Sequence, residues 1–133
     1  MDLPTRRRLV RTGIGILFIG AGLVHFTHAS LFENLVSAAL KDYRASINAI
    51  TGGLILAIGV AFLMPRLRAF ARRGAIALLA VTLPTTAYRA IHPAAIESLS
   101  LPPAFASVGV VAWLLMITLI WWAAKPEMND PNA

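Results

Sequence analysis

The chain has 133 residues, of which 58% are hydrophobic and only 14% are charged. A soluble domain of this length cannot bury so much apolar surface, so the composition predicts an integral membrane protein. The formal net charge is +6, but the basic residues lie beside apolar segments, which is typical of membrane anchors and argues against nucleic acid as a partner. Because the chain has no cysteine, disulfides, thiolate metal sites and covalent c-type haem are excluded.

A helix needs about 20 residues to cross the apolar core of a bilayer. Four apolar runs of that order occur, and they predict an all-α fold: one transmembrane domain, residues 1–133, built as a four-helix bundle. The predicted helices span residues 9–28, 47–64, 70–91 and 104–124. The polar tail, residues 126–133, is expected to be disordered.

A short amphipathic helix is expected in the loop between the first two spans. Ser30 and Glu33 match a capping box, in which each side chain satisfies a free backbone N–H of the first turn. Apolar residues then recur along one helical stripe, at Leu31, Phe32, Leu35, Val36, Ala39 and Leu40. Such a helix would lie on the outer membrane surface.

The distribution of Lys and Arg predicts the orientation, because positive charge near helix ends stays on the cytoplasmic side. One side would hold Arg6, Arg7, Arg8, Arg11, Arg66, Arg68, Arg72, Arg73 and Lys125. The other would hold only Lys41, Arg44 and Arg89. Both termini are therefore predicted to be cytoplasmic, in a multi-pass topology.

Small residues indicate close packing between helices, because they let two backbones approach in lipid. The first span has Gly15 and Gly22 seven residues apart, with Gly13 and Gly20 at the same spacing. In the second span, small residues recur at four-residue spacing at Gly53, Ala57 and Ala61, with Gly52 and Gly59 beside them.

The candidate site is a polar layer in the outer half of the predicted bundle. Counted along the helices, His25 and Tyr88 come to the same depth, and Thr51 on the second span comes to that of His25. Arg89 either extends to the outer headgroups or points into this layer, where it would attract an anionic or carbonyl-bearing ligand. The layer predicts a small, outward-opening ligand pocket formed by His25, Thr51, Tyr88 and Arg89.

The three histidines also allow a metal or haem site. His25 and His28 share a helix face, and His92 falls at the depth of His28. We favour a plainer interpretation, in which His25 forms a structural hydrogen bond to Tyr88 or to a backbone oxygen. No Asp or Glu lies within a predicted span, so we expect no catalysis by this chain alone.

Four segments resemble the DoxX-like family of small four-helix bacterial membrane proteins, over about residues 11–122. They read GIGILFIGAGLVHF (13–26), FENLV (32–36), ITGGLILAIGVAFLMPRLR (50–68) and LPTTAYRAIHP (83–93). Matches to the family pattern include Gly22, His25, Phe26, Pro84 and Tyr88. The chain departs from the pattern where it has Ile55 in place of a glutamate and Thr86 in place of an asparagine.

The resemblance implies a multi-pass protein of the bacterial inner membrane that is associated with membrane redox processes. Together with the polar layer, it favours an accessory subunit whose ligand is quinone-like or lipidic. The partner would be a larger membrane redox complex or a second copy of the chain, in addition to membrane lipid. One alternative is a non-catalytic scaffold that packs against a larger membrane complex through its glycine faces. Another is a haem-binding or metal-binding membrane anchor.

Overall fold

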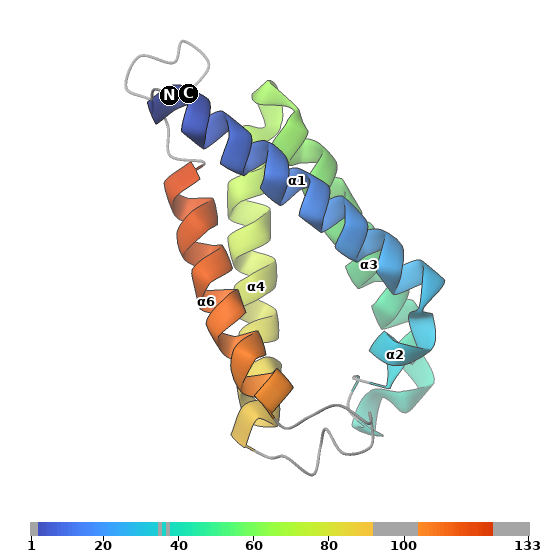
Figure 1. Cartoon of the computed structure of the whole chain (residues 1–133). Coiled ribbons are helices and arrows are strands. Elements are labelled where there is room, and N and C mark those ends of the chain that lie inside the picture. Colours follow the sequence, from blue (N-terminus) through green and yellow to red (C-terminus); the bar gives the residue numbers. More distant parts are fainter. Residues whose placement is uncertain (1–2, 35, 37, 92–103, 124–133) are drawn as a thin grey trace.

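The fold is all-helical in the computed structural model, which describes residues 3–34, 36, 38–91 and 104–123 (Figure 1). The α-helices are α1 (Leu3–Thr27), α2 (Ala29–Glu33), α3 (Arg44–Leu63), α4 (Arg68–Ile91) and α6 (Ala104–Ala123). Two 3₁₀ helices, η1 (Ala38–Tyr43) and η2 (Pro65–Leu67), precede α3 and α4. The prediction of an all-α chain is confirmed for the described residues.

The first long helix begins earlier than the apolar pattern predicts. α1 starts at Leu3 rather than at residue 9, because the arginines before the apolar run are good helix formers and Pro4 suits a first turn. It ends where His28 leaves the helical region, at φ −127° and ψ 47°. α1 is therefore an apolar helix with an arginine-rich first third.

The loop that follows differs from the expected amphipathic helix. α2 has only five residues, and Ser30 lies within it rather than at its N-cap, so its hydroxyl makes no capping bond. The next helical segment is the 3₁₀ helix η1, which bends at Leu40. Two short helical segments thus stand where one amphipathic helix was predicted. Leu35, a residue of the predicted apolar stripe, lies outside the described residues.

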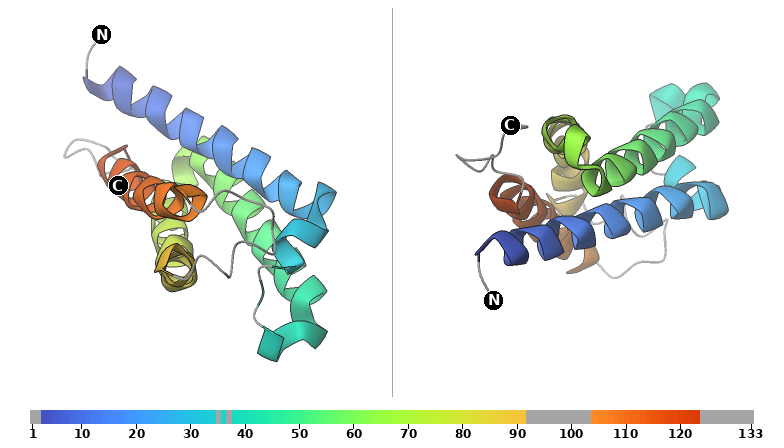
Figure 2. Two further views of the ribbon diagram at one scale, coloured as in Figure 1. Left: turned by 60° about the horizontal axis from the view of Figure 1, so that its bottom comes forward. Right: turned by 90° about the horizontal axis from the view of Figure 1, so that it is seen from above.

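The long helices pack as two pairs. α1 lies along α3 and α4 lies along α6, while α3 also contacts α4, and α1 contacts α6 (Figure 1). The two pairs meet at the end that holds the start of α1, η2 and the end of α6, and diverge toward the opposite end (Figures 1 and 2). We call these the closed end and the open end.

The hydrophobic core lies at the closed end. Its centre includes Phe18 of α1 and Phe62 of α3, whose ring centroids are 6.0 Å apart in a tilted arrangement. Buried residues from all four long helices complete it: Ile14, Ile58, Ala61, Ala71, Ala75, Leu79, Ile120 and Ala123. Side chains toward the open end, such as Leu23, Leu54 and Leu115, are exposed. The core therefore holds the two pairs together at one end only.

Glycines bring α1 and α3 into backbone contact. A Cβ on Gly59 would lie 2.8 Å from the backbone nitrogen of Ile19 and 2.9 Å from the carbonyl oxygen of Gly15. One on Gly22 would lie 2.9 Å from the backbone nitrogen of Leu56. Real Cβ atoms do not approach this closely, so only glycine fits. We call this contact of Gly15, Gly22, Gly52 and Gly59 the glycine seam.

Not every predicted packing residue belongs to the glycine seam. Gly53 and Ala57 are exposed, and a Cβ on Gly53 would meet nothing within 4 Å. Gly13 and Gly20 of α1 also face open space.

Two segments are long and apolar enough to cross a membrane: Leu3–Thr27 and Leu40–Leu63, with mean hydropathies of 1.7 and 2.0 over their best windows. Val110–Ala123 of α6 is also apolar but shorter. The arginines of α4 interrupt its apolar sequence. These lengths support the prediction that the chain contains membrane-spanning helices.

Candidate functional site

His25 lies in the last turn of α1, where two neighbours fix its ring. Its Nδ1 is 2.9 Å from the backbone oxygen of Ala21, and the ring stacks on that of Phe32 with centroids 3.7 Å apart and planes 19° apart. Because a carbonyl oxygen only accepts, Nδ1 must carry the hydrogen and donate it. In the neutral ring, Nε2 is then the nitrogen with a lone pair, available as an acceptor or a ligand.

The backbone of His25 is held by a side chain from α3. The last main-chain bond of α1 joins the N–H of His28 to the oxygen of Val24 at 2.9 Å, so the carbonyl of His25 has no donor from its own helix. Asn48 supplies one, because its Nδ2 donates to that oxygen at 2.8 Å. Asn48 thus caps the end of α1 from a neighbouring helix.

The other half of the Asn48 amide has no partner among the described residues. Asn48 is 5% exposed, and its Oδ1 is buried without a hydrogen bond. The amide cannot be turned round, since only its nitrogen can donate to the carbonyl. An unsatisfied buried acceptor costs about 1–3 kcal/mol, so this oxygen is a place where a small donor, such as water or a ligand hydroxyl, would be stabilised.

Two further features of α3 border this cluster. A Cβ on Gly52 would lie 2.8 Å from the Cβ of His25, so glycine is what lets the histidine sit against α3. Arg44 lies one turn before Asn48 on the same helix face, and its Nε is buried without a hydrogen-bond partner in the described chain. Thr51, a predicted pocket residue, is half-buried beside Gly52. We call His25, Asn48 and Arg44, with Phe32 against His25, the α1–α3 polar site.

The structure separates the predicted pocket residues. His25 and Thr51 belong to the α1–α3 pair, whereas Tyr88 is in the last turn of α4 and is 56% exposed. At the open end, the last turns of α1 and α4 lie on different sides of the molecule (Figure 1). The hydrogen bond of the His25 ring goes to a backbone oxygen, the second of the two predicted partners. Arg89 lies on α4, and its side chain is outside the described residues.

The predicted metal ligands are not assembled in the described part of the chain. The exposed side chain of His28 pairs with its neighbour, as its Nδ1 is 2.9 Å from the hydroxyl of Thr27. Within the described residues, no group of three or more His, Cys, Asp or Glu side chains is placed to hold a metal ion. His92 falls outside those residues.

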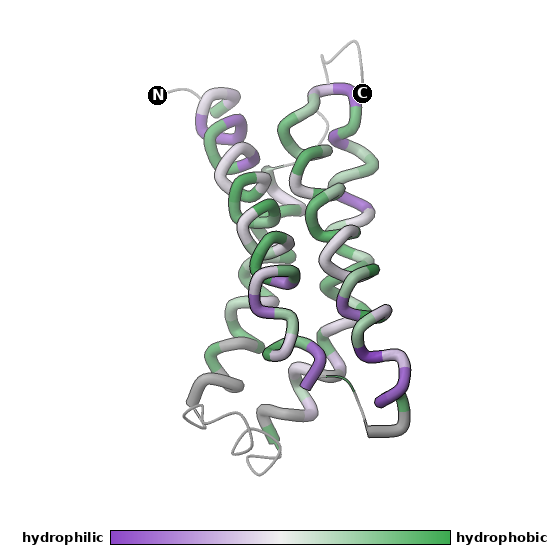
Figure 3. The backbone as a smooth tube through the Cα atoms, turned by 90° about the vertical axis from the view of Figure 1, so that its right-hand side faces the viewer, coloured by the Kyte–Doolittle hydropathy of each residue, from purple (hydrophilic) through white to green (hydrophobic). Residues whose placement is uncertain are grey.

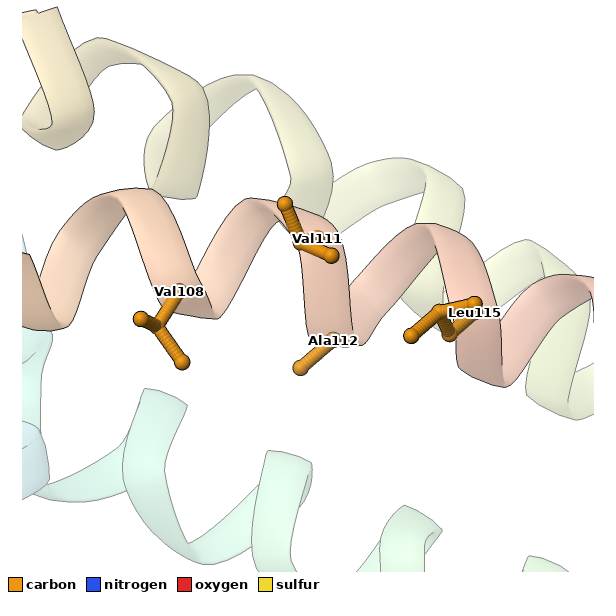
Figure 4. A pocket seen from close by; sticks show the side chains of 4 residues that line it. All are labelled: Val108, Val111, Ala112 and Leu115. Atoms are coloured by element: carbon orange, nitrogen blue, oxygen red, sulfur yellow. The ribbon is translucent and has the colours of Figure 1, made fainter.

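A polar link joins α6 to α4, and α6 also lines a hollow. The indole nitrogen of Trp113 donates to the Thr82 hydroxyl at 3.0 Å, and that hydroxyl donates to the backbone oxygen of Leu78 at 2.9 Å. Around the same stretch of α6, a hollow of about 360 Å³ is lined by Val108, Val111, Ala112 and Leu115 (Figure 4). All four are apolar, so this hollow offers no group that could orient a polar ligand.

Sequence reasoning missed Asn48, the residue that organises the site. A signal existed, because an asparagine within an apolar span is costly unless a partner satisfies it. Its partner is a backbone carbonyl, however, and depends on where α1 ends.

A comparison with curated proteins and with solved structures finds no significant match. A family model covers residues 14–126, which include all the described residues of the α1–α3 polar site. The chain belongs to the family described as "Domain of unknown function (DUF8561)".

Proposed function

We propose that this chain is an integral membrane protein that crosses the bilayer four times with both termini on the cytoplasmic side. The observation that carries the proposal is the outward exposure of large apolar side chains on all four long helices. Examples are Ile16, Leu17, Ile50, Leu54, Val81, Val111 and Leu115. Water does not tolerate an apolar surface of this extent, whereas lipid does. Val81, at 76% exposure, extends this surface to α4 despite the arginines of that helix.

The function within the membrane is that of an accessory, ligand-binding subunit with no turnover of its own. The α1–α3 polar site supports this, because among the described residues it consists of a histidine, an amide and a guanidinium, with no carboxylate or nucleophile in the site. Its ligand would be a lipid-soluble molecule with a hydroxyl or carbonyl head group, of which a quinol is one example. The DoxX resemblance points to the same class of ligand and to membrane redox processes in bacteria.

Binding of a quinol analogue to the protein in nanodiscs tests this function. His25→Phe keeps a ring on Phe32 but removes Nε2, and loss of one hydrogen bond should weaken binding about fivefold to tenfold. His28→Phe is the matched control, since His28 is exposed and pairs only with Thr27 among the described residues. Unchanged affinity in His25→Phe would eliminate the α1–α3 polar site as the binding site.

A second candidate function is assembly with a larger membrane partner. It is favoured by the small residues that the glycine seam leaves unused, namely Gly13, Gly20, Gly53 and Ala57, which face outward. Purification in a mild detergent separates the two candidates. A stoichiometric membrane partner would support assembly, and a lone chain that binds quinol would support the accessory role. An absorption spectrum of the same sample tests the haem alternative.

A further inference from the structure

The closed end carries a concentration of positive charge that the described chain does not balance. Eight of the ten arginines lie there: Arg6, Arg7, Arg8 and Arg11 on α1, then Arg66 on η2, and Arg68, Arg72 and Arg73 on α4. Figure 3 shows this hydrophilic stretch where α1 begins. The described carboxylates are Glu33 and Asp42, and both belong to the connection between α1 and α3 at the open end.

The acidic residues outside the described ranges cannot cancel this charge. Even if Asp2, Glu97, Glu127 and Asp130 all lay at the closed end, the eight arginines would outnumber them. Like charges gathered at one depth repel unless anions from outside neutralise them. The closed end therefore carries a net positive charge, which attracts external anions.

The tryptophans place this charge at headgroup depth. Trp121 and Trp122 end α6 at the closed end, and aromatic residues of this kind gather at membrane interfaces. The guanidinium of Arg7 lies 5.7 Å from the centroid of the Trp122 ring, in cation–π contact. Arg7 and Trp122 thus lie at one level, and the anions nearest a membrane interface are lipid headgroups.

One position at the closed end combines a cation with an apolar wall. A hollow of about 360 Å³ is lined by Leu63, Met64, Pro65 and Arg66, where the chain leaves α3. Met64 is extended, at φ −93° and ψ 118°, and this breaks the helix and opens the hollow. Arg66 is exposed, and no ion pair joins it to a carboxylate in the part of the chain that the structure describes.

We propose that this hollow binds one anionic phospholipid from the cytoplasmic leaflet. The phosphate would pair with the guanidinium of Arg66, whose planar fork matches two phosphate oxygens. An acyl chain would lie along Leu63 and Met64. Free phosphate is also an anion but has nothing to place on the apolar wall, so the lipid is the better fit. The inference rests on the proposed membrane orientation but is independent of the α1–α3 polar site.

The test uses the full chain in phosphatidylcholine vesicles with spin-labelled phosphatidylglycerol as the probe. Relative to spin-labelled phosphatidylcholine, the wild type should bind this probe preferentially, and Arg66→Gln should reduce that preference roughly fivefold. Arg8→Gln is the matched control, because it removes one exposed arginine from the same end. An equal loss in both variants would show diffuse charge attraction and overturn the proposal, as would no loss in Arg66→Gln.

A second variant separates lipid from free phosphate. Met64→Gln keeps every charge and changes a side chain that is about half exposed, so it leaves the core intact. It should weaken binding of the phospholipid probe while phosphate competes poorly in both proteins. If millimolar inorganic phosphate displaced the probe, or if Met64→Gln bound it unchanged, a phospholipid site would be excluded.

Discussion

The contact between the two helices of a pair differs from one pair to the other. α1 and α3 meet through glycines whose backbones touch, so that no Cβ fits at Gly22 or Gly59. α4 and α6 carry a side-chain link instead, the 3.0 Å hydrogen bond between Trp113 and Thr82. Backbone contact fixes the distance between two helices, whereas side-chain contacts can repack. The α1–α3 pair is therefore the rigid support, and the polar site lies on it.

The largest expected effect comes from filling the glycine seam. Gly59→Ala places a methyl group against backbone atoms of Ile19 and Gly15, which cannot move aside as side chains can. We expect a loss of about 1–3 kcal/mol in stability, measured as the midpoint of unfolding in mild detergent. Gly53→Ala is the control on the same helix, since its methyl group meets nothing within 4 Å. Equal stability of the two variants would contradict the glycine seam.

A smaller effect is expected at the cap of α1. Asn48→Ala removes the donor to the His25 carbonyl and leaves that oxygen unsatisfied, at a cost of about 1–2 kcal/mol. The same unfolding midpoint measures it, and hydrogen exchange should rise in the last turn of α1. Thr27→Ala provides the comparison, because its exposed hydroxyl bonds within its own helix, to Leu23. If Thr27→Ala loosened α1 as much as Asn48→Ala, the cross-helix cap would have no special role.

The smallest effect concerns the link between α4 and α6. A double-mutant cycle with Trp113→Phe and Thr82→Ala isolates this bond, and such bonds in membranes couple by about 0.6 kcal/mol on average. Thr118→Ala in place of Thr82→Ala gives the reference cycle, because Thr118 bonds to Leu114 of its own helix. A coupling energy larger than the stability loss of Gly59→Ala would reverse the comparison between the pairs.

The sequence predicted the helices well, because long apolar runs separated by polar residues leave few alternatives. It did not show which small residues of α3 face α1. Gly52 and Gly59 fit helical spacing, but so do Gly53 and Ala57, and only the partner helix decides between the two faces.

The polar site could be predicted only in part. Counting residues along a helix gives depth, so His25 and Tyr88 were expected at one level. Depth does not give the position around the molecule, and those residues lie on different helix pairs. The cap from Asn48 could not be predicted for another reason. It depends on α1 ending at Thr27, because this end leaves the carbonyl of His25 without a donor from its own helix.

Single-cysteine labelling tests most directly the proposal that four helices lie in the membrane with both chain ends on one side. The chain has no cysteine of its own, so each introduced thiol reports alone. In intact bacterial cells, a membrane-impermeant maleimide should label Asp42→Cys, while Thr5→Cys and Ala69→Cys should react only after permeabilisation. The exposed apolar positions Leu17, Val81 and Leu115 should resist the reagent as cysteines in both conditions. Ready labelling of these three positions would contradict the membrane-embedded account.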